Sequence, residues 1–216
     1  RIGAALTGLA FLAFGLWAYL TVGTPPARIL AHIGLAAGVG TALGLGPSLG
    51  SWNGVKDHIS TAATVWMYVL ILRFFVTFPG PKRVSGSRLA MWAIYGAWAG
   101  LLAFLGAELI VHPALYYSTG SVAYPLMLIY AILILAAIVH TVVKTPRAEL
   151  SRSGMHLILG GFLVTIAAVL AAFTAGSNLP GWTNSLMIVP IPLTMALAAR
   201  RQARALPPNL ADPAAL

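Results

Sequence analysis

The chain of 216 residues contains no cysteine and only four acidic residues. The absence of cysteine excludes disulfide bonds and thiolate metal sites. Charged residues make up 8% of the sequence, whereas a soluble domain usually carries about a quarter. This is too little charge to cover a water-facing surface. Because 59% of the residues are hydrophobic, we expect most of the molecular surface to face lipid.

The formal net charge of +9 arises from 13 Lys and Arg against four Asp and Glu. In a soluble protein such an excess would suggest nucleic-acid binding. Here the cations lie between apolar runs, as they do in loops that face an anionic membrane leaflet. We therefore expect the lipid bilayer, and not nucleic acid, as the partner of this chain.

Seven stretches are apolar enough to cross a bilayer as helices, which requires about 20 residues each. β-Strands of a barrel are excluded because the runs are too long and lack alternation with a period of two. The predicted fold is therefore all-α, a seven-transmembrane-helix bundle over residues 1–201 with a Pro-rich cytoplasmic tail at 202–216. Because the loops are short, we expect consecutive helices to pack as antiparallel neighbours. The predicted spans are Ile2 to Val22, Arg28 to Gly46, Ile59 to Phe78, Arg88 to Val111, Val122 to Val143, Met155 to Ala175 and Trp182 to Ala199.

The distribution of cations predicts the direction of these spans, since Lys and Arg accumulate in cytoplasmic loops. With the amino terminus outside, the outer face receives only Arg1 and Lys56, and Arg73 lies near the inner end of the third span. The inner face then receives Arg28, Lys82, Arg83, Arg88, Lys144, Arg147, Arg152, Arg200, Arg201 and Arg204. We expect these cations, together with Arg73, to set the topology and to contact lipid headgroups. The predicted location is a bacterial cytoplasmic (inner) membrane.

Three pairs of glycines are spaced four residues apart, which allows helices to approach closely. Packing within the chain is the main interpretation, and a homodimer interface is the alternative. The pairs are Gly34 and Gly38, Gly40 and Gly44, and Gly96 and Gly100.

Two acids and two histidines lie at the predicted outer level. Glu108 stands four residues before His112, so both project from one helical face, while Asp57 and His58 open the third span. Carboxylates and imidazoles at one depth could bind a divalent metal or share a proton.

A pocket above these groups would be walled by Tyr116 and Tyr117. The alternative interpretations are structural: Asp57 caps a helix, Glu108 reaches the interface, and the aromatic rings form an interfacial belt. No metal site is predicted.

Three further histidines, His32, His140 and His156, lie near inner span ends. Paired transmembrane histidines can ligate a tetrapyrrole, which is a minor alternative to contact with headgroups. We expect no cofactor. The sequence also lacks a G-x-S-x-G motif and a phosphate-binding loop, so we expect no enzyme activity.

The stretch "RFFVTFPGPKR" at 73–83 ends an apolar run at prolines and continues with cations. It resembles the end of a middle helix in the multi-spanning (7TM-type) N-terminal sensor domains of bacterial histidine kinases. "YAILILAAIVHTVVKTPRAELSRSGMHLILGGFLVTI" and "LMIVPIPLTMALAARR" resemble the later helices of that family. The similarity covers about residues 65–201. "RQARALPPNLADPAAL" departs from the pattern, with no phospho-acceptor histidine or ATP-binding motif, so the resemblance implies a membrane sensor without the kinase.

The first functional hypothesis is therefore a signal-transducing sensor domain that binds a small or hydrophobic ligand or a partner. The second is a non-catalytic accessory subunit of a respiratory, photosynthetic or secretory membrane complex, together with other membrane proteins. The third is a small proton-coupled transporter that depends on Glu108.

Overall fold

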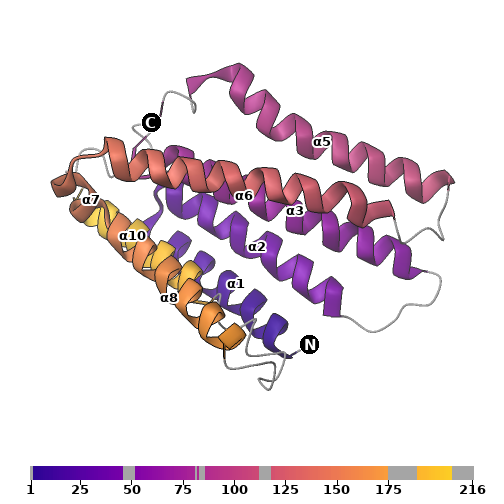
Figure 1. The fold of residues 1–216 in the computed structure, drawn as a ribbon, viewed down its shortest axis with the longest axis horizontal. Coiled ribbons are helices and arrows are strands. Elements are labelled where there is room, and N and C mark those ends of the chain that lie inside the picture. Colours follow the sequence, from indigo (N-terminus) through magenta and orange to yellow (C-terminus); the bar gives the residue numbers. More distant parts are fainter. Residues whose placement is uncertain are drawn as a thin grey trace.

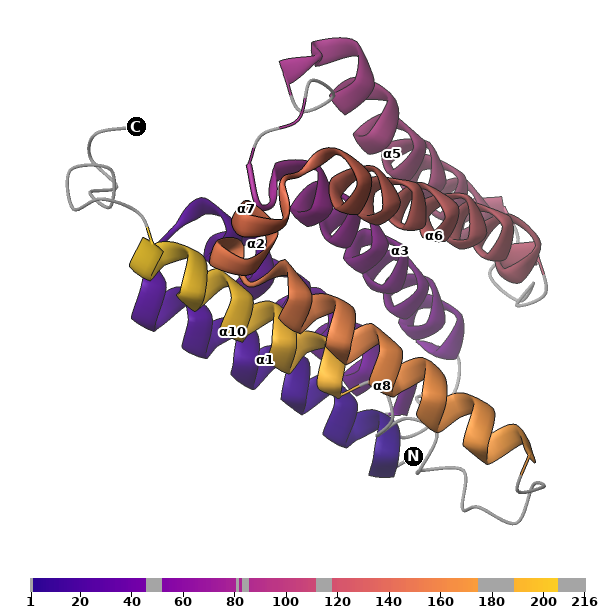
Figure 2. The ribbon, with the colours of Figure 1, turned by 60° about the vertical axis from the view of Figure 1, so that its left-hand side comes forward.

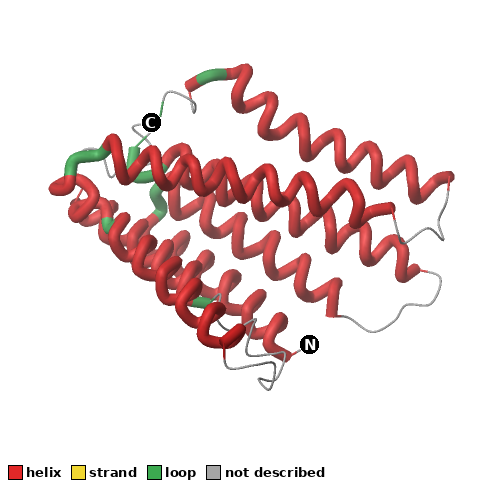
Figure 3. The backbone as a smooth tube through the Cα atoms, viewed as in Figure 1, coloured by secondary structure: helices red, strands yellow, loops and turns green. Residues whose placement is uncertain are grey.

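A computed structural model describes residues 2–45, 52–80, 82, 86–111, 118–174 and 189–205. Throughout these ranges the regular secondary structure is helical, as the sequence predicts (Figure 3). The helices are α1 (Ile2–Val22), α2 (Pro25–Leu45), α3 (Asn53–Thr77), α5 (Arg88–Val111), α6 (Ser118–Lys144), α7 (Arg147–Ser153), α8 (Met155–Thr174) and α10 (Pro190–Ala205).

Five of the described helices, α1, α2, α3, α5 and α6, are long and apolar enough to cross a membrane. The short helix α7 meets α8 at a bend of 78°, and the two count as a sixth candidate if they form one broken span. The helix α10 has 16 residues, and the predicted seventh span begins before it, outside the described residues. The prediction of a multi-pass helical membrane protein is thus confirmed at this coarser level.

The helices form two groups that α2 connects (Figures 1 and 2). In one group α1 and α8 both pack against α10, and in the other α5 and α6 both pack against α3. The packing of α2 against both α1 and α3 joins the groups. The helices α5 and α6 are neighbours as expected, since Tyr130 Oη donates a 2.6 Å hydrogen bond to Ile94 O, but α6 lies mainly against α3.

Glycines allow the closest approaches between helices. A Cβ at Gly15 would lie 2.6 Å from the carbonyl oxygen of Leu30, and one at Gly34 would lie 2.5 Å from that of Phe11. These contacts hold α1 against α2 with no room for side chains. Gly40 also lies at an interface, since its carbonyl oxygen accepts a 2.8 Å hydrogen bond from Ser60 Oγ on α3.

The third predicted glycine pair, Gly96 and Gly100, differs from the first two. A Cβ at either position would meet no atom of the described residues within 4 Å. Packing within the chain is therefore confirmed for the α2 glycines and is not seen for this pair on α5.

The end of α3 lies in the buried core. Phe74, Phe75 and Phe78 are fully buried, and the rings of Phe74 and Phe78 stack with centroids 5.0 Å apart. The ring of Phe75 faces that of Phe162 on α8 at 6.2 Å. The abrupt end of this aromatic run therefore marks the place where α3 contacts α8 of the group formed by α1, α8 and α10, a role that sequence analysis did not assign.

Candidate functional site: the His58–Glu108 pair between α3 and α5

The structure brings together one acid and one histidine from different helices. His58 lies near the start of α3 and Glu108 near the end of α5, and their Nε2 and Oε2 atoms are 3.5 Å apart. The side chains are 6% and 14% exposed, respectively. Because the two helices run antiparallel, groups 50 positions apart in the sequence meet at the same level of the bundle.

The hydrogen bonds of His58 fix which nitrogen faces the acid. Its Nδ1 lies 2.6 Å from the carbonyl oxygen of Gly54, one turn earlier on α3. A carbonyl oxygen only accepts, so Nδ1 carries a hydrogen and Nε2 is the atom turned toward Glu108. Neither Nε2 nor Oε2 has a hydrogen-bond partner among the described residues.

This geometry has a definite chemical consequence. A separation of 3.5 Å exceeds that of a well-formed hydrogen bond, about 2.7–3.2 Å. A proton on either atom gives the pair an attractive contact, whereas loss of that proton places the Nε2 lone pair opposite a carboxylate. Buried polar groups without partners are costly, so the protonation of the pair affects how closely α3 and α5 approach.

The other predicted members of the site have different positions. Asp57 takes no part in the described pair, and it lies inside α3, which begins at Asn53. The helix therefore starts before Asp57, and the prediction that Asp57 caps it is wrong. His112, Tyr116 and Tyr117 lie outside the described residues. Within the described part of the chain no three His, Asp or Glu residues gather closely enough to hold a metal ion.

An aromatic seam, formed by Trp66, Tyr95 and Trp98, continues from the pair along the α3–α5 interface. The rings of Trp66 and Trp98 have centroids 4.3 Å apart, and Trp66 and Tyr95 are 5.8 Å apart. The indole Nε1 of Trp98 donates a 3.2 Å hydrogen bond to the carbonyl oxygen of Ala62. Sequence analysis missed the seam, because aromatic residues within apolar spans resemble ordinary core or lipid-facing side chains.

The exposed side chain of Arg73 lies at the other end of the seam. Its guanidinium carbon lies 5.8 Å from the centre of the Tyr95 ring, which is within cation–π distance. Sequence analysis assigned Arg73 a role in topology and did not predict its contact with Tyr95. Arg73 thus has a specific partner on α5 in addition to any headgroup.

The remaining histidines do not form a facing pair. His32, His140 and His156 are exposed on α2, α6 and α8, respectively. No two of these three helices belong to the packed pairs of the described structure. The tetrapyrrole hypothesis therefore gains no support from this arrangement.

Lys82 is the one described cation of the Pro-rich turn after α3. Its Nζ donates hydrogen bonds to the carbonyl oxygens of Phe75 and Phe78, at 2.9 Å for the latter. Its backbone N–H donates to Val76 O at 3.1 Å. Burial lowers the pKa of Lys82 from 10.5 to about 8. Lys82 thus satisfies the open carbonyl groups of the helix end.

Comparisons of the chain with protein-family models, curated proteins and solved structures found no match. The described geometry is therefore the basis for assigning a function.

Proposed function

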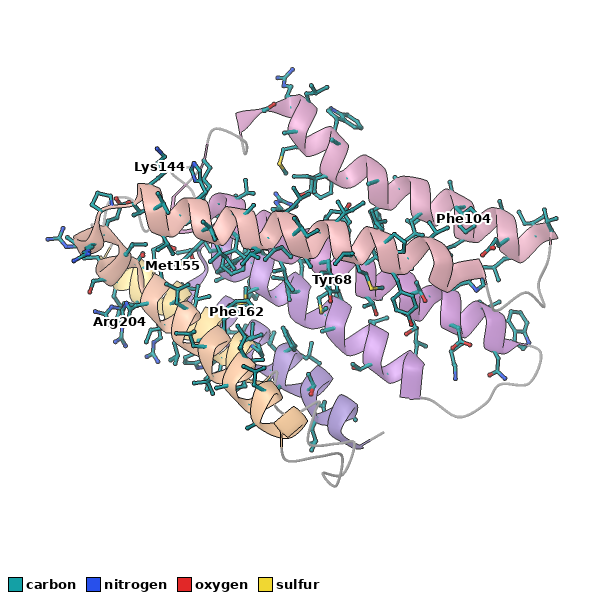
Figure 4. All side chains as sticks on the ribbon, viewed as in Figure 1. Tyr68, Phe104, Lys144, Met155, Phe162 and Arg204 are labelled. Atoms are coloured by element: carbon teal, nitrogen blue, oxygen red, sulfur yellow. The ribbon has the colours of Figure 1, made fainter. Side chains whose placement is uncertain are left out.

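We propose that this chain is a seven-helix sensory domain of a bacterial cytoplasmic membrane, with its amino terminus outside and no catalysis of its own. The cations support this direction, since Lys144 and Arg204 lie at one end of the bundle and Phe104 lies toward the other (Figure 4). The antiparallel helices bring the starts of α2 and α5 to the same end as Lys144. Cations concentrated on one face are typical of the cytoplasmic side.

The observation that carries the proposal is the buried contact between His58 and Glu108. Ionisable side chains in transmembrane helices are costly, and they commonly mark functional sites. Here each belongs to a different helix, so their protonation is coupled to the packing of α5 against α3. We propose that external protons, or a small ligand that competes with the pair, are the signal that this site detects.

The helix α5 is suited to respond because little of it is anchored. Its buried residues are Leu101 and Leu105, while most of its other positions remain half-buried or exposed. A stimulus shifts a conformational equilibrium only if it prefers one of the two states. Protonation of the pair favours the docked position of α5, and deprotonation favours a separated one.

Infrared difference spectroscopy of the protein in nanodiscs tests this function. The chain has only four acids, so a carboxylic acid C=O band can be assigned by substitution. We expect acidification to produce a band from a buried carboxyl group that Glu108→Gln abolishes and His58→Gln displaces. Glu149→Gln is the matched control, because Glu149 is exposed on α7. If the Glu108→Gln spectrum equals that of the unsubstituted protein, the pair is not the proton sensor.

A small proton-coupled transporter is the second candidate, and the same buried pair favours it. In that case Glu108→Gln abolishes proton-driven uptake into vesicles. A sensor instead shows proton-dependent movement of α5 without net proton flux.

The accessory-subunit hypothesis is favoured if stoichiometric membrane partners are recovered with the chain in mild detergent.

A further inference from the structure

A large cleft opens at the cation-rich end of the bundle, far along α3 and α5 from the His58–Glu108 pair. It lies between the end of α3, the start of α5 and the end of α6, and its volume is about 1020 Å³. This is at the upper limit of ordinary ligand pockets, about 300–1,000 Å³. The cleft opens where α6 packs mainly on α3 and contacts α5 less extensively, although Tyr130 Oη of α6 donates a 2.6 Å hydrogen bond to Ile94 O of α5.

The walls of the cleft are apolar over most of their length. The apolar side chains come from all three helices. The cleft is therefore a groove between helices. The residues are Leu72, Val76, Ala93, Ile94, Leu133 and Ala137. An apolar groove of this kind favours hydrocarbon over water.

The rim of the cleft is cationic. Lys82 follows α3, and His140 and Lys144 come from the last turns of α6. The acid on the rim is Glu149 of α7. Two lysines against one carboxylate favour an anionic group, and the helical carbonyl groups that Lys82 contacts hold its ammonium in place.

We propose that this cleft binds one anionic phospholipid, with an acyl chain along the apolar wall and its phosphate near Lys82 and Lys144. The apolar wall favours a lipid over a soluble phosphate ester, and the charge favours an anionic over a zwitterionic headgroup. This inference goes beyond the proposed sensory function and does not depend on it.

The site is expected to be sensitive to pH in the alkaline range. Lys82 has a pKa of about 8, lowered by burial, so it loses its charge as the pH rises past that value. The groups that face it across the cleft are His140, Lys144 and Glu149. Lys144 is the second lysine of the rim and is exposed. Binding of the anionic lipid therefore weakens, without disappearing, between pH 7 and pH 9.

Native mass spectrometry of the full chain in mild detergent tests the proposal. Phosphatidylglycerol is titrated against Lys144→Gln and against Arg152→Gln, a matched control that removes an exposed cation of α7 outside the cleft. We expect about fivefold weaker binding for Lys144→Gln and no change for Arg152→Gln. Equal losses in both variants would mean that lipid binds through general surface charge, which overturns the site.

A second pair of measurements separates a lipid from a free phosphate. Phosphatidylcholine with the same chains and glycerol phosphate without chains are both expected to bind at least fivefold more weakly than phosphatidylglycerol. Ala93→Phe, which fills the groove, is expected to reduce phosphatidylglycerol binding as much as Lys144→Gln does. Equal binding of glycerol phosphate, or full binding to Ala93→Phe, contradicts the proposal. If Ala93→Phe does not fold, the comparison of Lys144→Gln with Arg152→Gln is decisive.

Discussion

The indole rings of Trp66 on α3 and Trp98 on α5 lie with their centroids 4.3 Å apart, inclined by 38°. Trp98 also donates a hydrogen bond to the backbone of Ala62 on α3. This contact lies between the His58–Glu108 pair and the Arg73–Tyr95 contact along the same interface. The Trp66–Trp98 contact therefore holds the middle of α5 against α3. The end of α5 that carries Glu108 can then move in response to the His58–Glu108 pair.

Replacement of Trp98 should weaken the contact between α3 and α5. Trp98→Phe removes the hydrogen bond to Ala62 and part of the stacking, and we expect the free energy of unfolding to fall by about 1–2 kcal/mol. Unfolding in mixed detergent micelles measures the change. The control is Trp92→Phe, because Trp92 is exposed on the same helix and should change stability little. Equal losses in the two variants would show that the contact adds no stability.

The close approach of α1 and α2 gives a second prediction. Gly34→Ala places a Cβ 2.5 Å from Phe11 O, so the helices must separate, and we expect a loss of about 1–3 kcal/mol. Gly96→Ala is the matched control, since its Cβ meets no described atom within 4 Å. Thermal unfolding in detergent measures the loss of stability in each of the two variants. If Gly96→Ala destabilises the protein as much as Gly34→Ala does, the close approach of α1 and α2 is not the cause of the loss.

The sequence predicted the helical class, most helix positions and the level at which an acid and a histidine would meet. Apolar runs and the loops between them determine those features. The contact of His58 with Glu108 depends on the rotation of α3 relative to α5, and no periodicity encodes that rotation. The limited contact between α5 and α6 was equally unpredictable, because it follows from the packing of α6 mainly on α3.

The turn after α3 gives a prediction about pH and stability. The folded chain releases the Lys82 proton near pH 8, whereas the unfolded chain keeps it until about 10.5. Between these values the unfolded state binds more protons, so the free energy of unfolding rises with pH. Unfolding measured at pH 7, 8, 9 and 10 should show this rise, and Lys82→Gln should reduce it. An unchanged slope in the variant would assign the rise to other groups.

The direction of the helices can be tested by labelling, which is simple in a chain without cysteine. In intact cells, an impermeant thiol reagent should modify Lys56→Cys, which lies near the start of α3, and should not modify Arg147→Cys on α7. Both positions should react after permeabilisation. Modification of Arg147→Cys from outside would contradict the proposed orientation.

The most direct test of the central claim is the distance between the outer ends of α3 and α5, measured by spin labels at Ile59→Cys and Ile110→Cys. Both positions are exposed and flank the His58–Glu108 pair. We predict one short distance at acidic pH and a growing population of longer distances as the pH rises, with no such pH dependence once Glu108→Gln is introduced. A distance independent of pH in the otherwise unsubstituted chain, or one that still changes with Glu108→Gln, would contradict the account.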